Sequence, residues 1–359
     1  MSAENQWKNT DLVDESTSET TLLEVEDLMT HIHTERGTVR AVDGVSFDIN
    51  RGETVCIVGE SGSGKSVTCE SLTRIISQPP AEIKQGRVTF DGTQLLDISE
   101  KEIRSIRGNR IAHVFQNPQS ALDPVYTIGK QVVEAITIHE ELEEDDARQR
   151  AIDLLRKVGI SRAHERIDEY PHEFSGGMQQ RAAIAIALAA DPELLIADEP
   201  TTAVDVTVQA RLIELLRGLS NAGMSMLWIT HDLRVVAAIA DRVIVMYGGT
   251  IVEEGPIKEV FTKPAHPYTQ ALFESYHGLA DDSGRPAREH IPGDGCRFRG
   301  QCRFAVDECA GGNQPAFASV PDSSAHQAAC VYYHNDRDPT QILEEATDAR
   351  PIAPEVSDD

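Results

Sequence analysis

The stretch "ETVCIVGESGSGKSVTCESLTRII", residues 53–76, decides the fold. Residues 53–58 form a short apolar run rich in β-branched side chains, which predicts a buried strand, and residues 65–76 have helical character. Between them, "GESGSGKS" (Gly59–Ser66) fits the pattern G-x-x-x-x-G-K-[ST] in the context that this pattern requires, with a strand before and a helix after. The same alternation of strands and helices continues along the chain. It predicts an α/β protein with a mostly parallel sheet covered on both faces.

The glycine-rich loop has the composition of a phosphate-binding site. Its glycines let backbone N–H groups turn inward around phosphate oxygens, and the helix that follows adds the partial positive charge of its N-terminus. Lys65 is expected to reach the β- and γ-phosphates, and Ser66 is expected to ligate Mg²⁺. The predicted phosphate contacts are Gly59, Glu60, Ser61, Gly62, Ser63, Gly64, Lys65 and Ser66.

A second motif, the segment "LLIADEP" (residues 194–200), supplies the acidic groups that hydrolysis needs. Its apolar residues predict a strand that delivers Asp198 and Glu199 to the carboxyl edge of the sheet, where ligands bind in such folds. Asp198 is expected to hold Mg²⁺ through water. Glu199 is expected to polarise an attacking water as a general base.

A second turn of serine and glycine occurs more than a hundred residues after the first. The segment "SGGMQQR" (residues 175–181) opens an apolar helical run. A second helix N-terminus with free N–H donors is suited to stabilise negative charge on the far side of a γ-phosphate.

Composition and charge exclude several classes of protein. The chain has 359 residues, 40% of them hydrophobic, and its longest run of small apolar residues (182–190) is far too short to span a bilayer. The first 20 residues lack the pattern of a signal peptide, so we expect a cytosolic protein. With 59 acidic and 33 basic residues the net charge is −26, which argues against nucleic-acid binding.

The excess of acid is spread along the chain, for example in "EELEEDD" (residues 140–146) and in the C-terminal tail. Such blocks are commonly solvated faces or disordered ends. The sharper interpretation is adaptation to a cytosol of high salt, where self-repulsion is screened, as in a halophilic organism.

The order of the motifs resembles that of the ATP-binding-cassette (ABC) ATPases. The P-loop is followed by "VFQNP" around Gln116, "SGGMQQR", "LLIADEP", "TTAVD" ending at Asp205, and "ITHD" around His231. The resemblance covers roughly residues 22–262. It implies a P-loop cassette with a RecA-like core, an antiparallel β part and a helical subdomain at about 119–190.

In that family two cassettes face each other head to tail and sandwich two ATP molecules. The resemblance therefore implies that Ser175, Gly176 and Gly177, with Gln179 beside them, contact the ATP held by the partner's P-loop. Asp205 would cross the dimer interface.

Two further residues take roles from the resemblance. Gln116 would touch Mg²⁺ or the attacking water, in the loop that joins the core to the helical subdomain. His231 would contact the γ-phosphate and hold the water and Glu199 in place. One departure concerns the contact with the adenine base of the nucleotide. The family places an aromatic residue there to stack on adenine, whereas this chain has Ile32, between His31 and His33. Aliphatic packing or imidazole stacking would have to replace it, which leaves ATP against GTP selectivity open.

The C-terminal part narrows the resemblance. "KPAHPYTQALFES" (263–275), "IPGDGCRFRGQCRFAVDECAGG" (291–312) and "AACVYYH" (328–334) look like the extension of ATPases of dipeptide, oligopeptide and nickel importers.

Four of the six cysteines lie in this extension, at Cys296, Cys302, Cys309 and Cys330. Zinc sites more commonly contain a C-x₂-C to C-x₄-C pair, and disulfides are disfavoured in a reducing cytosol. Four thiolates suit an iron–sulfur cluster, and the resemblance implies a [4Fe–4S] cluster. Zinc and free thiols remain alternatives.

We therefore expect an ATP- and Mg²⁺-dependent ATPase at the cytoplasmic face of the membrane, driving an importer of dipeptides or oligopeptides. Its partners would be two permease subunits, a second cassette that is a distinct subunit or a second copy, and indirectly an extracytoplasmic binding protein. Import of nickel or sugars is an alternative, and a soluble ABC ATPase of repair or translation is a more distant one. The expected organisation is an acidic arm at 1–21, a cassette at 22–262, an extension with the four-cysteine site at 263–335, and an acidic disordered tail at 336–359.

Overall fold

An eight-stranded mixed sheet carries the P-loop strand in its interior. The computed structural model describes residues 21–117, 121–200, 206–276, 291–334 and 337–346. The strand order is β11-β12-β10-β9-β3-β8-β7-β6, with β9, β3, β8, β7 and β6 parallel and the other three antiparallel. These strands are β3 (Thr54–Val58), β6 (Ile111–Val114), β7 (Leu194–Asp198), β8 (Ser225–Ile229), β9 (Arg242–Tyr247), β10 (Thr250–Pro256), β11 (Ala318–Ser319) and β12 (Gln327–Ala328).

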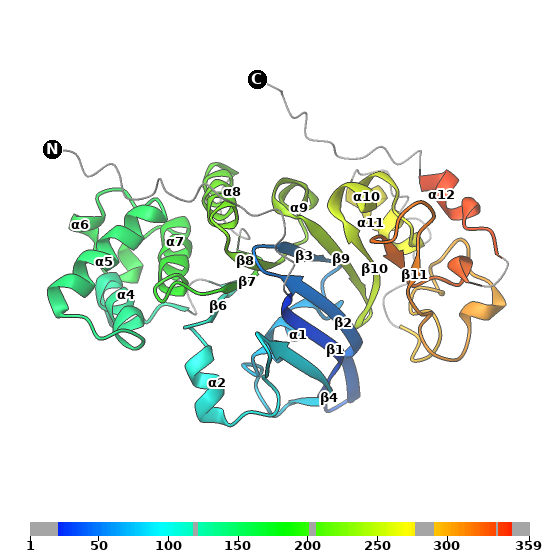
Figure 1. Cartoon of the computed structure of the whole chain (residues 1–359), viewed down its shortest axis with the longest axis horizontal. Coiled ribbons are helices and arrows are strands. Elements are labelled where there is room, and N and C mark those ends of the chain that lie inside the picture. The colour runs from blue at the N-terminus through cyan, green and yellow to red at the C-terminus, as the bar shows by residue number, and fades with distance from the viewer. Residues whose placement is uncertain (1–20, 118–120, 201–205, 277–290, 335–336, 347–359) are drawn as a thin grey trace, which may run out of the picture.

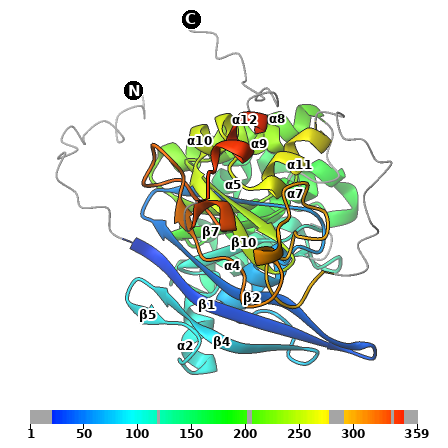
Figure 2. The same cartoon turned by 90° about the vertical axis from the view of Figure 1, so that its right-hand side faces the viewer.

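A second sheet is antiparallel and is built from the N-terminal half of the chain. Its order is β2-β1-β4-β5, and Figure 2 shows its long strands below the central sheet. The strands are β1 (Thr21–Thr34), β2 (Gly37–Asn50), β4 (Ala81–Phe90) and β5 (Thr93–Gln94). The alternation of buried and exposed residues in β1 and β2 is that of a sheet with one face on the core.

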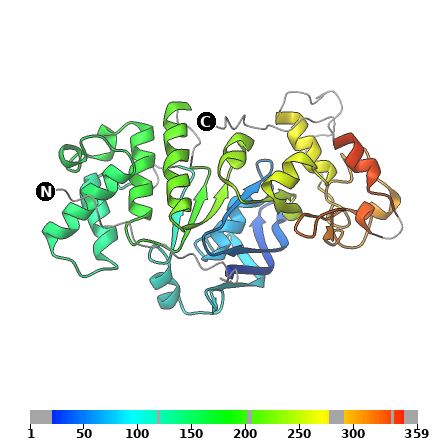
Figure 3. The same cartoon turned by 45° about the horizontal axis from the view of Figure 1, so that its top comes forward.

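Helices gather at the two ends of the molecule and over the central sheet. Figure 1 shows α4 to α7 at one end and the C-terminal region at the other, and Figure 3 shows the same separation from a second direction. The helices are α1 (Lys65–Leu72), α2 (Glu100–Ile106), α4 (Ile128–Thr137), α5 (Glu144–Lys157), α6 (Ala163–Arg166), α7 (Gly176–Ala187), α8 (Val206–Asn221), α9 (Leu233–Ile239), α10 (Ile257–Thr262), α11 (Pro267–Tyr276) and α12 (Thr340–Ala346).

Local sequence explains several helix ends. Ser99 caps α2 in a capping box with Glu102, and Thr127 accepts a hydrogen bond from the N–H of Lys130 at the start of α4. Part of the acidic block noted above begins α5, whose first turn is acidic and whose last turn is basic, as the helix dipole favours.

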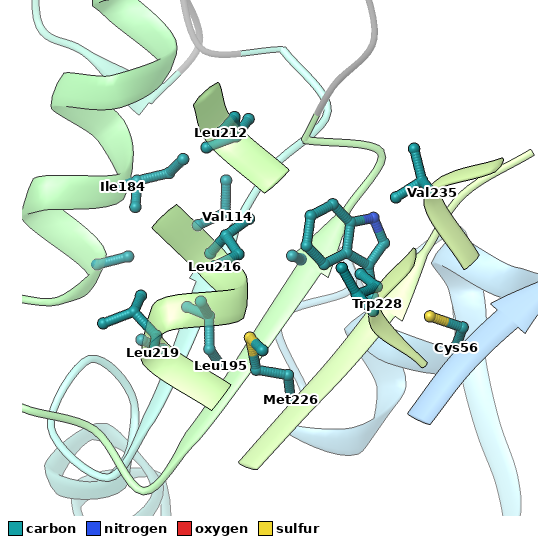
Figure 4. Close-up of a cluster of buried hydrophobic side chains, with 14 of the residues drawn as sticks. Cys56, Val114, Ile184, Leu195, Leu212, Leu216, Leu219, Met226, Trp228 and Val235 are labelled. Carbon is teal, nitrogen blue, oxygen red and sulfur yellow. The ribbon is translucent and has the colours of Figure 1, made fainter. Parts of the chain in front are cut away.

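Buried apolar side chains fix the helical end against the strands that lead to the predicted site. In Figure 4, Ile184 of α7 and Leu212, Leu216 and Leu219 of α8 lie over Trp228 and its neighbours on the central sheet. The strands β3 and β8 are buried at every residue, which is typical of parallel strands covered on both faces.

A buried carboxylate joins the C-terminal region to the cassette. Glu253 of β10 has no exposed surface and accepts hydrogen bonds from the N–H groups of Ala265 and His266, at 2.8 and 2.7 Å. His326 Nε2 lies 2.7 Å from its Oε1, just before β12, which pairs with β10. The C-terminal region therefore extends the edge of the central sheet. In the described part of the chain, no helix is long and apolar enough to cross a membrane.

Candidate active site

The carboxyl ends of four parallel strands bring the predicted site residues to one edge of the central sheet. The strands β3, β8, β7 and β6 are neighbours in this order. The P-loop follows β3, and His231, Glu199 and Gln116 follow β8, β7 and β6. This is the edge where ligands bind in sheets of this kind.

Close backbone approaches explain the glycines of the P-loop. A Cβ atom on Gly59 would lie 2.3 Å from the carbonyl oxygen of Met246, and one on Gly64 would lie 2.3 Å from that of Ala41. Both glycines also have positive φ, of 150° and 106°. Any other residue at either position would displace the loop from the strands that support it.

The ammonium group of Lys65 is held over the loop. Its Nζ donates to the carbonyl oxygens of Gly59 and Glu60, both at 2.8 Å. Burial lowers the pKa of Lys65, and the nearby carboxylates of Glu199 and Asp198 partly oppose this shift. The loop therefore carries a buried cation at the start of a helix, which is an environment that favours phosphate.

Ser66 and Asp198 fit the expected Mg²⁺ site. The Ser66 hydroxyl hydrogen-bonds to the Asp198 carboxylate, and burial raises the pKa of Asp198 despite that hydrogen bond. Oδ1 of Asp198 is buried and has no hydrogen-bond partner among the described residues. A hydroxyl and a carboxylate with an unused oxygen are ligands that Mg²⁺ prefers.

Glu199 is contacted by both residues assigned to assist it. Gln116 Nε2 donates to Oε2 of Glu199 at 3.1 Å, and His231 Nδ1 lies 3.2 Å from Oε1. The Glu199 side chain is 16% exposed, whereas that of His231 is 63% exposed. Gln116 and His231, from two other strand ends, therefore meet at the largely buried carboxylate of Glu199.

The backbone at Glu199 is bent to make this meeting possible. Its φ is +45°, which is uncommon for a residue other than glycine, and its N–H donates to the carbonyl oxygen of Ile229 at 2.9 Å. The end of β7 is thus tied to β8, the strand that leads to His231.

The second glycine turn lies at the start of α7, away from the P-loop of the same chain. Ser175 is the N-cap residue, and its side chain makes no capping hydrogen bond. A Cβ atom on Gly176 would meet no atom within 4 Å, so the turn is open on that side. In Figure 1, the strands β6 to β8 separate α7 from α1. Ser175, Gly176 and Gly177 therefore do not complete the phosphate site of their own chain.

Gln179 occupies a different position from that expected of a nucleotide contact. Its side chain is buried, and Nε2 donates to the carbonyl oxygens of Pro171 at 2.7 Å and Phe174 at 3.3 Å. These bonds hold the preceding turn under the helix. The described contacts of Gln179 are thus structural, and its role at a nucleotide stays a prediction.

Two other expected contacts remain without a test. Ile32 lies in β1, opposite Val39 and Ala81. Nε2 of the neighbouring His33 lies within hydrogen-bonding distance of Oε2 of Glu82, at 2.8 Å. Asp205 lies outside the described residues, as do residues 1–20 and 347–359 of the expected arm and tail.

Sequence reasoning missed two residues that contact the site loops, Tyr268 and Tyr276. Tyr268 accepts a hydrogen bond from the N–H of Glu60 in the P-loop, at 2.9 Å. Tyr276 donates to Asp232, the residue after His231, also at 2.9 Å. The adjacency of Asp232 to His231 was a signal in the sequence, whereas nothing in the sequence placed α11 beside these loops.

The four C-terminal cysteines lie in one region but do not form a ligand set. Burial raises the pKa of Cys296, that of Cys302 to about 11 and that of Cys330 to about 12, and the charge of at least one other cysteine of the four raises each of them further. Four thiols are chemically suitable for a cluster. Among the described residues, however, no group of three or more His, Cys, Asp or Glu side chains is arranged to hold a metal ion. The geometry therefore lends no support to the expected [4Fe–4S] cluster.

Comparisons with known proteins agree with the geometry of the nucleotide site. A family model of ABC transporters matches residues 42–202, and a model of the oligopeptide/dipeptide transporter C-terminal region matches residues 252–309. The oligopeptide transport ATP-binding protein OppD of Bacillus subtilis is 49% identical over 275 residues, which are 76% of each chain. The probable peptide ABC transporter ATP-binding protein y4tR of Sinorhizobium fredii is 45% identical over 320 residues, covering 86% of this chain and 94% of its own.

Solved structures resemble the cassette part. The ATP-binding cassette MJ0796, in a dimeric post-hydrolysis state bound to ADP and Pi, is 27% identical with a TM-score of 0.60, covering 66% of this chain and 98% of its own. Sequence, site geometry and relatives thus agree, and the chain belongs to the ATP-hydrolysing subunits of ABC transporters, in the group that carries the oligopeptide/dipeptide transporter C-terminal region.

Proposed function

We propose that this ATPase energises the import of dipeptides or oligopeptides from the cytoplasmic face of a membrane. The observation that carries the proposal is the match of residues 252–309 to the oligopeptide/dipeptide transporter C-terminal region, on a chain whose cassette has its hydrolytic groups in contact. The curated relatives named above are a peptide and an oligopeptide transport protein. Nickel and sugars are the alternative cargoes. A role in repair or translation is disfavoured because the C-terminal region belongs to transporters.

Within the site, each residue has a distinct proposed task. Lys65 and the P-loop N–H groups bind the β- and γ-phosphates, and Ser66 and Asp198 hold Mg²⁺, which supplies charge neutralisation when bound. Glu199 orients the attacking water and accepts its proton. Gln116 and His231 fix the carboxylate of Glu199, and the exposed face of His231 is available to the γ-phosphate.

The second glycine turn is assigned to the partner's nucleotide. Ser175 and Gly176 are open to solvent and lie apart from the P-loop of their own chain, which supports a head-to-tail pair of cassettes. The structures of MJ0796 are also described as dimeric. Gly177 and Asp205 belong to the same proposed interface. The partner cassette is a distinct subunit or a second copy of this chain.

A permease contact is proposed beside Gln116. Several large hydrophobic residues around this loop and the helical end are exposed, among them Phe115, Val125 and Tyr126. Exposed apolar groups that flank a catalytic loop are suited to receive a helix from a membrane partner. Two permeases and an extracytoplasmic binding protein would complete the importer.

Two finer proposals concern the salt content of the cytosol and the four C-terminal cysteines. The net charge of −26 supports a cytosol of high salt, as in a halophile. Four thiolates in one region of the chain, Cys296, Cys302, Cys309 and Cys330, are chemically suited to a [4Fe–4S] cluster, but their arrangement is not that of a metal site, and zinc and free thiols are the alternatives. Iron and acid-labile sulfide, measured in protein prepared without oxygen, decide among the three, and absence of both rules out the cluster.

The importer is tested by co-purification. A tagged Glu199→Gln chain is expressed in its native cells and recovered from solubilised membranes in high KCl, with and without ATP. Two permeases, a second cassette and a binding protein that retains peptide are the expected yield. Recovery of soluble partners alone would contradict transport, and a binding protein that retains nickel or sugar would reassign the cargo.

A further inference from the structure

Helix α11 of the C-terminal region contacts two of the four loops that carry the predicted site residues, the P-loop and the loop that bears His231. Near its start, the hydroxyl oxygen of Tyr268 accepts from the N–H of Glu60 at 2.9 Å. At its end, the hydroxyl of Tyr276 donates to Oδ1 of Asp232, also at 2.9 Å. The two tyrosines are roughly 12 Å apart along the helix axis. One short helix therefore spans the distance between the P-loop and the loop that bears His231.

The contact of Tyr268 is rigid on both sides. Its ring is 1% exposed and packs on Tyr247 with ring centroids 4.5 Å apart. The carbonyl oxygen of Glu60 accepts from Lys65 Nζ at 2.8 Å and from the N–H of Ser63 at 3.1 Å. The peptide groups on the two sides of Glu60 thus link a tyrosine of the C-terminal region to the lysine expected to bind phosphate.

The contact of Tyr276 reaches the residue next to His231. Asp232 caps α9 by accepting from the N–H of Arg234 at 3.0 Å, and it accepts a further hydrogen bond from Gln209 Nε2 at 3.1 Å. Burial opposes ionisation of this carboxyl, but the hydrogen bonds from Arg234 and Tyr276 outweigh it and lower the pKa of Asp232 to about 2. Asp232 is therefore a charged anchor at all physiological pH values.

At the Tyr276 end, close packing does not by itself fix the loops against α11. A pocket of about 460 Å³, open to solvent, lies there, lined by Gly59, Glu60, His231, Leu272 and Tyr276 among others. Across a gap of this size, directional hydrogen bonds determine the position of the loops more than van der Waals contact does.

We propose that Tyr276 and Tyr268 are positioning residues of the ATPase, so that α11 forms part of the catalytic centre. Tyr276 holds His231 in register with Glu199 through Asp232. Tyr268 holds the first turn of the P-loop through Glu60. The inference rests on the proposed role of His231 in hydrolysis. It gives the C-terminal region a function in the ATPase cycle.

Variants that each lack a single hydroxyl group test this proposal. Tyr276→Phe and Tyr268→Phe remove one hydroxyl each and keep the ring. Tyr333→Phe is the matched control, because Tyr333 also lies in the C-terminal region and donates to a backbone carbonyl, that of Ala265 at 2.8 Å. Hydrogen–deuterium exchange of the full chain is followed in peptides that cover residues 229–236 and 58–66.

Each variant is expected to loosen a different loop. Tyr276→Phe should speed exchange in residues 229–236, Tyr268→Phe should do so in residues 58–66, and Tyr333→Phe should do neither. Unchanged exchange in both loops would overturn the proposal whether or not the chain hydrolyses ATP.

Kinetics separate positioning from general stability. Tyr276→Phe should lower kcat about five- to tenfold, equivalent to about 1.0–1.4 kcal/mol, with little change in KM for MgATP. Tyr268→Phe should mainly raise KM. His231→Ala serves as the benchmark. Loss of kcat in His231→Ala with none in Tyr276→Phe overturns this inference alone, whereas full activity of His231→Ala overturns the proposed role of the histidine.

Discussion

The imidazole Nδ1 of His231 lies 3.2 Å from Oε1 of Glu199, and the other carboxylate oxygen accepts from Gln116 at 3.1 Å. Three strand ends thus converge on one carboxylate. Both of its oxygens are contacted by side chains of the protein itself, which fixes the orientation of Glu199 and suits its proposed work on a water molecule. Pre-oriented groups lower a barrier because they need no rearrangement during the reaction.

Replacement of Glu199 by glutamine should separate binding from hydrolysis. Glu199→Gln is expected to lower kcat by about 100-fold or more, because the amide cannot accept a proton, while ATP still binds. Steady-state hydrolysis and calorimetric ATP binding measure the two effects. Glu214→Gln, at an exposed position on α8, is the control. Unchanged hydrolysis in Glu199→Gln would refute the assignment.

Mixing two inactive variants tests the shared site. In a head-to-tail homodimer, Lys65→Ala and Ser175→Arg each disable both sites, but a mixed dimer keeps one intact site. Random pairing in a 1:1 mixture should restore roughly a quarter of the wild-type rate. No recovery would contradict a site built from two copies of this chain, and it would favour a distinct partner subunit.

Stability should fall as the pH is lowered from 7 to 5, in part because of His266. Burial lowers the pKa of His266 to about 3, and its Nδ1 accepts from the N–H of Tyr268 at 3.0 Å. In the unfolded chain this histidine takes up a proton near pH 6.5, whereas in the folded chain it stays neutral until about pH 3. Protonation between these values favours unfolding, and this one group should cost about 2 kcal/mol at pH 5.

A variant isolates this contribution. His266→Asn keeps an acceptor for the N–H of Tyr268 but does not titrate, so its stability should depend less on pH over the same range. His164→Asn, at an exposed site, should leave the dependence unchanged. Denaturant unfolding at pH 7 and pH 5 measures the unfolding free energy at each pH. If this free energy changes equally with pH in His266→Asn and in the wild type, His266 is excluded as the source.

Among the acidic residues, Glu253 should be the one whose replacement most weakens the attachment of the C-terminal region to the cassette. Glu253→Gln turns one of its two acceptor oxygens into a donor that faces the N–H groups of Ala265 and His266, or His326. The free energy of unfolding is expected to fall by about 3 kcal/mol. Glu254→Gln on the same strand should change it by less than about 1 kcal/mol, since burial already raises the pKa of Glu254. Equal effects would contradict the special role of Glu253.

Salt should stabilise the protein. With a net charge of −26, repulsion among carboxylates opposes the folded state, and molar KCl shortens the screening length from about 10 Å to about 3 Å. The thermal midpoint should therefore rise between low and molar KCl. An uncharged solute at equal osmolarity is the control, because it does not screen charge. Equal midpoints in low and high KCl would defeat the idea of adaptation to salt.

Much of the site was predictable because its signals are local. The glycines of the P-loop, Lys65 and Ser66 lie within eight consecutive residues, between a strand and a helix whose apolar patterns are plain. Asp198 and Glu199 likewise end an apolar strand. The contacts of Gln179 were not predictable, because its bonds to the carbonyl oxygens of Pro171 and Phe174 depend on how the preceding turn packs against α7, and its role at a nucleotide stays a prediction.

By itself, the sequence determined the strand–loop–helix unit of the P-loop, the acidic strand end and the membership of the chain in its family. These features depend on neighbouring residues and on residue type. Only the tertiary structure decided which other distant groups meet: Gln116 at the second oxygen of Glu199, Glu253 at the C-terminal region, and α11 at the P-loop and the loop that bears His231. Such contacts are set by strand order and by helix packing over the whole core, which no local stretch of sequence encodes.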